Sequence, residues 1–162
     1  MSKVHHVVGV ALACVLATSA NAQLLQHKDL SSAIATTIAL TAVDACKAQG
    51  YNVSVHVVGR NGEVLVGLRH HAAGVNTFEN SWKKAYTSRT FRIASGKFAE
   101  NVGQNPVAGQ LFLANITAAR GALPIMIGEE TIGAVGVSGA PGGDKDEVCA
   151  QAGIDKVKDQ LR

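Results

Sequence analysis

The chain has 162 residues, a formal net charge of +3 and few aromatic side chains, which make up 4% of the sequence. This length suits one domain behind a short leader and leaves no room for a second domain of ordinary size. The modest basic excess argues against a nucleic-acid partner, because nucleic-acid-binding domains usually carry a clear surplus of Lys and Arg.

The first 22 residues have the three parts of a secretory signal peptide. Lys3 is basic with no acidic neighbour, residues 7–17 are almost wholly apolar, and residues 20–22 form a small-x-small cleavage site. The apolar run is too short for a membrane span, which takes roughly 20 residues. We therefore expect a signal peptide over 1–22, one domain over 23–162, and a periplasmic or secreted protein without a stable membrane anchor. A buried N-terminal helix is the alternative.

The first element of the mature chain is predicted to be a helix over residues 30–49, ending before Gly50. Its apolar positions recur at steps of three and four residues: Leu30, Ile34, Ile38, Ala42 and Ala45. A period of two follows, in which Val53, Val55 and Val57 alternate with other side chains. Together with the tight-turn pair Asn61-Gly62, this alternation predicts a β-hairpin over residues 53–69.

A second helix is predicted from Asn76, which forms a capping box with Glu79. Its apolar side chains fall on one stripe, typical of a core-facing side: Val75, Phe78, Trp82, Ala85, Tyr86 and Ile93. Arg89 lies in the middle of that stripe, which is unusual for a charged residue. It either reaches past the edge of the helix to a partner or stacks on Trp82 or Tyr86.

The second half of the chain predicts a short helix over 96–102, an irregular segment over 103–121, and strands over 123–127 and 131–138. A last helix is predicted to begin with Asp144 and Glu147 as its cap, and to bury Ala150, Ile154, Val157 and Leu161. The order of elements is α-β-β-α-α-β-β-α, with hairpins in place of βαβ crossovers. This order predicts an α/β protein of the α+β type, with helices packed on an antiparallel sheet.

Two cysteines remain after removal of the signal peptide, Cys46 and Cys149. They belong to the first and last predicted helices, and each lies at the flank of its helix's apolar face. Contact between them is possible but not required, so a disulfide in an oxidising compartment is a hypothesis. The chain has no C-x-x-C-H motif, which excludes covalent c-type haem attachment, and neither C-x-x-C nor H-E-x-x-H occurs.

Three segments carry a resemblance to a known family: KAYTSRTF at 84–91, ASGKFAE at 94–100, and the glycine-rich block at 123–154. They resemble the GlcG/HbpS family, the haem-degrading domain family, which is related to the C-terminal domain of PduO-type proteins. The resemblance covers about residues 28–160. It implies an antiparallel sheet with helices, assembly into homo-oligomers, and binding of haem or a related tetrapyrrole; exported members are linked to haem sequestration and redox sensing.

His70-His71 is the most suggestive local feature, because family members often have Met-Asp at this place. Imidazole is a common axial ligand of haem iron, so either histidine is a candidate metal ligand for haem b. Adjacent residues at a strand end point apart, so one ring is expected to bind while the other faces solvent. The alternative is a pair of solvated loop histidines.

The second predicted helix offers further candidates for contact with a haem. Tyr86 is a candidate for ring contact, although a core position is its alternative. Lys84 and Arg89 are candidates for pairing with propionates, and a solvated helix surface is the alternative for both. His56 lies in mid-strand, opposite the valines, where a covered histidine is the simpler interpretation.

Three functions remain open from the sequence. The first is an exported protein that holds haem non-covalently, as a scavenger or as an accessory to a redox sensor. The second is an enzyme or accessory protein acting on a small organic acid or a tetrapyrrole, although no catalytic motif is present. The third is an oligomeric interaction module without a cofactor.

Overall fold

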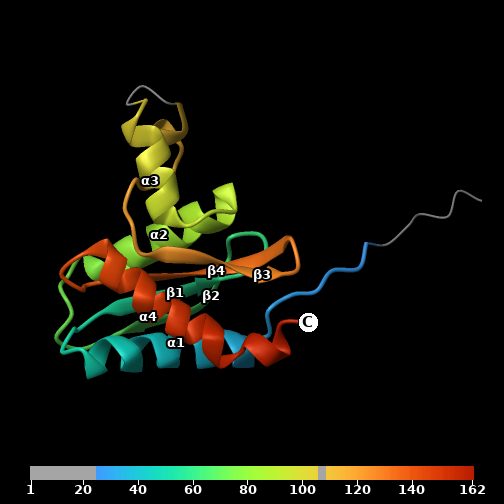
Figure 1. The fold of residues 1–162 in the computed structure, drawn as a ribbon, viewed down its shortest axis with the longest axis horizontal. Coiled ribbons are helices and arrows are strands. Elements are labelled where there is room, and N and C mark those ends of the chain that lie inside the picture. Colours follow the sequence, from blue (N-terminus) through green and yellow to red (C-terminus); the bar gives the residue numbers. More distant parts are fainter. Residues whose placement is uncertain (1–24, 106–108) are drawn as a thin grey trace, which may run out of the picture.

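The structure, a computed structural model, describes residues 25–105 and 109–162. The predicted signal peptide over residues 1–22 lies outside the described residues. The elements follow in the order α1, β1, β2, α2, α3, β3, β4 and α4, with short 3-10 turns at Gly109–Phe112 and Lys158–Gln160 (Figure 1). This order and the antiparallel sheet confirm the predicted α+β fold.

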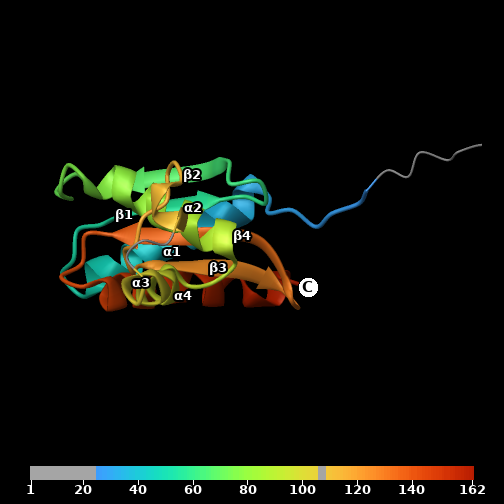
Figure 2. The ribbon, with the colours of Figure 1, turned by 90° about the horizontal axis from the view of Figure 1, so that it is seen from above.

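The four strands form one sheet in the order β2-β1-β4-β3, so that β2 and β3 are its edges (Figure 2). The strands are β1 (Ser54–Val58), β2 (Val64–Arg69), β3 (Ala122–Ile127) and β4 (Glu130–Ser138). Both predicted hairpins are present, and β1 pairs with β4 at the centre. The first hairpin turns at Gly62, whose φ of 81° is readily adopted only by glycine.

Helices α1 (Ser32–Ala48) and α4 (Gly143–Lys156) lie together against one face of the sheet (Figure 1). The main core lies between them and the strands, and it includes Ile38, Val55, Val57, Ile125 and Val135. A disulfide joins Cys46 of α1 to Cys149 of α4, with the two Cα atoms 5.5 Å apart. The first and last helices of the domain are therefore covalently linked on this face.

Helix α2 (Thr77–Phe91) lies on the opposite face, and its orientation corrects the sequence prediction. The predicted core stripe is only partly buried. Val75 and Phe78 are 91% and 40% exposed, and Ala85 is fully covered, while three members are half-buried: Trp82, Tyr86 and Ile93. The buried side of α2 instead carries small and polar residues: Thr77, Ser81, Lys84, Ala85, Thr87 and Ser88. Because Gly136 in β4 has no side chain, the backbone of α2 approaches the sheet closely, and a Cβ there would lie 2.2 Å from the Ser81 carbonyl oxygen.

Both helix caps predicted around acidic residues are wrong. Asn76 makes no side-chain capping bond, and the nearby Thr77 hydroxyl donates to the Gly74 carbonyl instead. Helix α4 begins after Gly142, also without a side-chain capping bond. These helices gain their stability from packing on the sheet, which outweighs the contribution of a cap.

Helix α3 (Ser95–Gly103) stands away from the layered body, at the top of Figure 1. It is joined to α2 by a tight connection in which Arg92 adopts a left-handed conformation, with φ of 60°. The stacked rings of Phe91 and Phe98 hold the two helices together, with centroids 4.4 Å apart. The chain then returns to the sheet at β3.

Candidate functional site

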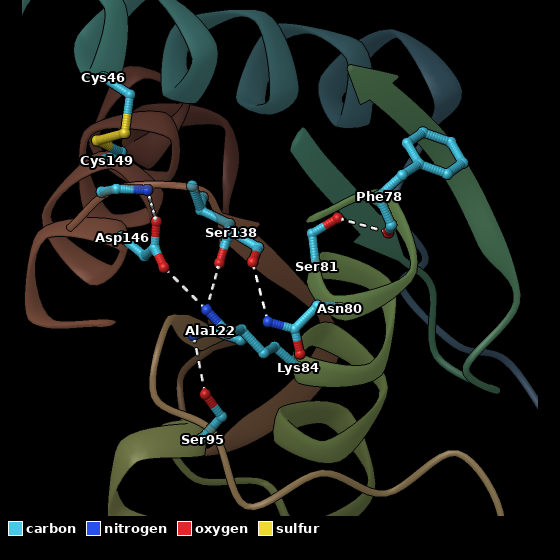
Figure 3. A network of polar contacts seen from close by, with 12 residues as sticks. Cys46, Phe78, Asn80, Ser81, Lys84, Ser95, Ala122, Ser138, Asp146 and Cys149 are labelled. Carbon is cyan, nitrogen blue, oxygen red and sulfur yellow. Dashed lines mark hydrogen bonds and ion pairs between the residues drawn. A yellow bond between two sulfur atoms is a disulfide. The ribbon is translucent and has the colours of Figure 1, made fainter. Parts of the chain in front are cut away.

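A layer of polar side chains fills the space between α2 and the sheet. Three pairs cross this space at 2.8–2.9 Å: Ser54 with Thr77, His56 with Ser81, and Ser138 with Asn80. They lie along one side of the helix from its first turn to its second (Figure 3 shows part of this network). Buried polar groups must be hydrogen bonded to be tolerated, so these pairs fix how α2 sits on the sheet.

The polar layer ends at a buried ion pair between Lys84 and Asp146, which are 4% and 2% exposed. The Lys84 ammonium donates to Asp146 at 2.8 Å and to the Val137 carbonyl at 3.0 Å. The second carboxylate oxygen of Asp146 accepts the Ala140 N–H at 3.0 Å. Burial raises the pKa of Asp146, although Lys84 and its hydrogen bond act in the opposite direction.

This pair corrects the expected role of Lys84. Its ammonium is enclosed and engaged with Asp146, so it is not accessible to a haem propionate (Figure 3). The pair connects α2 to α4, two helices on opposite faces of the sheet, around the end of β4. The role of Lys84 is therefore structural.

His56 is a covered histidine, as its mid-strand position predicts. Ser81 donates its hydroxyl proton to the Phe78 carbonyl, so the ring Nδ1–H of His56 donates to Ser81 and Nε2 keeps its lone pair. The Phe78 ring lies edge-on, with centroids 4.3 Å apart, and Gly67 of β2 leaves the space that Nε2 fills. Burial lowers the pKa of His56 to about 4.

His70 and His71 lie directly after β2, and both rings lie on one side of the chain. The expectation that they point apart is wrong, because their ring centroids are 4.2 Å apart. The chain turns at His70, whose carbonyl accepts the Ala73 N–H, so the alternation of the strand does not continue. The pKa of His70 is lowered by desolvation first, then by His71 and by Lys47 at the end of α1.

Tyr86 lies on the outer side of α2, next to Trp82, and both are partly buried. The Tyr86 ring covers Gly62 at the turn of the first hairpin, where a Cβ would lie 2.7 Å from the ring. The indole N–H of Trp82 is buried and has no hydrogen-bond partner among the described residues. This edge of α2 therefore leans over the β1–β2 hairpin.

Arg89 lies at the other end of this hairpin from the histidine pair. It lines a pocket of about 160 Å³ together with Arg60, which follows β1, and Arg92, which ends α2. His70 instead lies beside the start of β1, where its N–H donates to the Val53 carbonyl. The structure thus does not bring the candidate axial ligands and Arg89 to one place.

Neither a membrane-spanning helix nor a cluster of metal-binding side chains is present among the described residues. Over 25–105 and 109–162, no helix is long and apolar enough to cross a membrane. In the same ranges, no three His, Cys, Asp or Glu side chains gather into a group that could hold a metal ion. A single axial ligand to haem iron needs no such group.

Comparisons with known proteins agree with this architecture. A crystal structure of HbpS is 34% identical, with a TM-score of 0.77, covering 82% of this chain and 93% of that one. A double mutant of Streptomyces reticuli HbpS is 33% identical, with a TM-score of 0.78, covering 90% and 97%. A PduOC:heme complex is 22% identical, with a TM-score of 0.71, covering 78% and 94%, and shares the fold. No protein with a curated description matches significantly.

The match to a protein family is equally extensive. Residues 30–155, nearly all of the described domain, match the family of HbpS-like haem-degrading proteins. These residues run from the segment before α1 to the last turn of α4, so the match includes both hairpins and the disulfide-linked helices. The chain therefore belongs to the HbpS-like family.

Proposed function

We propose that this protein is exported and holds haem b non-covalently, as a scavenger or as an accessory to a redox sensor. The observation that carries the proposal is membership of the HbpS-like family of haem-degrading proteins. The PduOC:heme complex, which has the same fold, is by its name a haem complex. Haem supplies an iron with open axial positions, which a neutral imidazole can occupy.

We place the haem at the corner where β2 leads into α2, with His71 or His70 as the axial ligand. His71 is exposed and follows the strand directly, so its ring is accessible. His70 Nδ1 accepts the Ala72 N–H at 3.2 Å, which leaves the proton of the neutral ring on Nε2. Ligation through Nε2 of His70 would require that this bond break, so His71 is the better ligand of the two.

The surroundings of this corner fit a flat apolar ligand with acidic groups. Val75 and Phe78, a few residues after the histidines, are exposed apolar side chains beside which a porphyrin ring can lie. Arg69 is exposed at the end of β2 and donates to the Ala73 carbonyl, which holds the guanidinium at the corner. It replaces the buried Lys84 as the candidate partner of a propionate.

Export and oligomerisation belong to the same proposal. The Cys46–Cys149 disulfide is typical of an oxidising compartment, which supports the signal peptide expected from residues 1–22. Phe112 and Leu113 are 80% and 53% exposed on the segment after α3, where a second copy of the chain can cover them. Intact mass of the exported protein tests cleavage before Gln23, and size-exclusion chromatography with light scattering tests the oligomer.

A haemin titration followed by the Soret band tests the haem site. We expect saturable binding by the wild type, weaker binding or a shifted Soret band for His71→Ala, and a smaller change for His70→Ala. His27→Ala, an exposed histidine near the N-terminus, is the matched control and should behave as the wild type.

The outcomes of this titration separate the three functions. A double variant that lacks both His70 and His71 but keeps the wild-type Soret position and affinity would refute the axial assignment. Loss of the Soret band with formation of a product, in the presence of a reductant, would favour the enzyme. Absence of any saturable spectral change would favour the interaction module without a cofactor.

A further inference from the structure

The pocket around Arg89 is not used by the proposed haem site and has its own chemistry. It has a volume of about 160 Å³ and is lined by Arg60, Arg89, Arg92, Glu129, Glu130 and Thr131. The arginines come from the end of β1 and from the last turn of α2, and the acidic residues from the β3–β4 turn. Three guanidinium groups thus converge from two separate parts of the chain.

Arg60 forms one wall of this pocket, and the positive charge of its guanidinium is already balanced. Its guanidinium donates to the carboxylates of Asp29 and Glu130 and to the Lys28 carbonyl. The hydrogen bonds to Asp29 and Glu130 raise the pKa of Arg60. Because all three of its nitrogens have partners, Arg60 and Glu130 position the pocket and leave ligand binding to the other arginines.

Arg89 and Arg92 lack such partners. Neither forms an ion pair with a carboxylate in the described part of the chain, and the Nε of Arg89 is buried without a hydrogen-bond acceptor there. The pKa of Arg89 is lowered by burial first, then by Arg92 and Arg60, while Glu63 acts in the opposite direction. Glu63 itself accepts the Asn61 N–H in the hairpin turn. A buried donor without an acceptor is costly, and an anion supplies one.

The backbone holds Arg92 at this place in an uncommon conformation. Its φ of 60° lies in the left-handed region, which is unfavourable for a residue with a side chain. The bend lets α3 turn away from α2 and directs the chain so that Arg92 lines the same pocket as Arg89. Paired guanidinium groups are well suited to bind both oxygens of a carboxylate or phosphate.

We propose that Arg89 and Arg92 form a binding site for a small oxyanion, either a carboxylate or a phosphate. A pocket of about 160 Å³ is smaller than the usual pocket for a drug-sized ligand, so the ligand is much smaller than a haem. Arg89 supplies the buried donor and Arg92 the more exposed one. Glu129, which also lines the pocket, limits the number of negative charges that the ligand can carry.

Isothermal titration calorimetry on the full purified protein tests the site, with potassium phosphate and sodium oxalate as probes at constant ionic strength in chloride. We expect at least one probe to bind saturably. Arg89→Gln and Arg92→Gln should each weaken it about tenfold or more, as expected for loss of charged hydrogen bonds. Arg120→Gln is the matched control, because Arg120 pairs with Glu100 outside the pocket and should bind as the wild type.

Two results would overturn the proposal: no saturable binding of either probe by the wild type, or wild-type affinity in the Arg89→Gln, Arg92→Gln double variant. Circular dichroism without anion establishes that each variant folds. If Arg89→Gln does not fold, Arg92→Gln decides the question, because Arg92 is exposed. A haemin titration of Arg92→Gln should match the wild type, which separates this site from the haem site. Binding of phosphate alone or oxalate alone identifies which oxyanion the site takes.

Discussion

Lowering the pH should destabilise the protein through His56. Its neutral ring is enclosed beneath α2, where Nδ1–H donates to Ser81 and Nε2 lies against Phe78 and Gly67. A proton on Nε2 would place a positive charge in this buried space, and burial disfavours the charged form. In the unfolded chain the same imidazole is solvated and takes up a proton at its ordinary pKa.

The magnitude follows from the two pKa values. Burial lowers the pKa of His56 from 6.5 to about 4 in the folded state. Between these values the unfolded state binds more protons than the folded state, so the free energy of unfolding falls as the pH falls. One pKa unit corresponds to about 1.4 kcal/mol, so His56 costs about 2 kcal/mol at pH 5 and about 3 kcal/mol at pH 4. Only well above pH 6.5, where the imidazole is neutral in both states, is its contribution constant.

Urea unfolding of the wild type and of His56→Gln, at steps from about pH 7.5 to pH 4.5, isolates this contribution from those of the other titrating groups. The variant should be less stable at the highest pH, because it packs less well, and its disadvantage should shrink or reverse as the pH falls. His27→Gln, which changes an exposed histidine, should follow the wild-type curve. Parallel curves for wild type and His56→Gln across the whole range would refute the reasoning.

Three other changes probe the scaffold. Asp146→Ala leaves the buried ammonium of its lysine partner without a counter-charge and should cost about 3–5 kcal/mol in urea unfolding, whereas a loss below 1 kcal/mol would contradict a buried pair. Reduction of Cys46–Cys149 opens a loop with a sequence separation of 103 and should lower the free energy of unfolding by about 4–5 kcal/mol; an unchanged midpoint under reducing conditions would count against this. Gly136→Ala places a Cβ 2.2 Å from the α2 backbone and should lower the free energy of unfolding by about 1–3 kcal/mol, measured by thermal unfolding. The control Gly103→Ala, with open space around it, should be neutral or stabilising.

The hairpins could be predicted from the sequence because their signals are local. The alternating valines and the Asn61-Gly62 pair that predict β1 and β2 lie within a few residues of each other in the sequence. The same holds for α1, whose predicted apolar stripe is its buried side: Ile38 and Ala42 are fully covered. In these elements the side chains that look apolar are the ones that the fold buries.

The orientation of α2 could not be predicted in this way. Where α2 crosses Gly136 of β4, its backbone comes so close to the sheet that small residues such as Ser81 and Ala85 lie at the contact, while Trp82 packs at its side. The periodicity of apolar residues shows which side of a helix is hydrophobic. It gives no information about the shape of the sheet surface on which the helix packs. The predicted stripe was therefore right for Ala85, which is fully buried, and wrong for Val75 and Phe78, which are exposed.

The candidate site could be predicted only in part, because several of its residues contact partners that are distant in the sequence. Lys84 and Asp146 are 62 residues apart in the chain, and nothing near either of them indicates the other. Arg60 and Arg92 line one pocket only because the fold brings the end of β1 close to the end of α2. The histidine pair was recognisable because its members are adjacent in sequence, yet the turn after His70 changed the direction of the rings.

Helix α2 packs so closely on the sheet that its inner and outer sides are under different constraints. On the inner side, Ser81 and Ala85 lie so close to Gly136 that a Cβ there would meet their backbone, so larger residues at this contact work against folding. Side chains that face solvent, such as Glu79 and Lys83, can change while the inner side keeps the helix in place. The fold therefore leaves the outer side of this one helix free to change its surface chemistry without moving the helix.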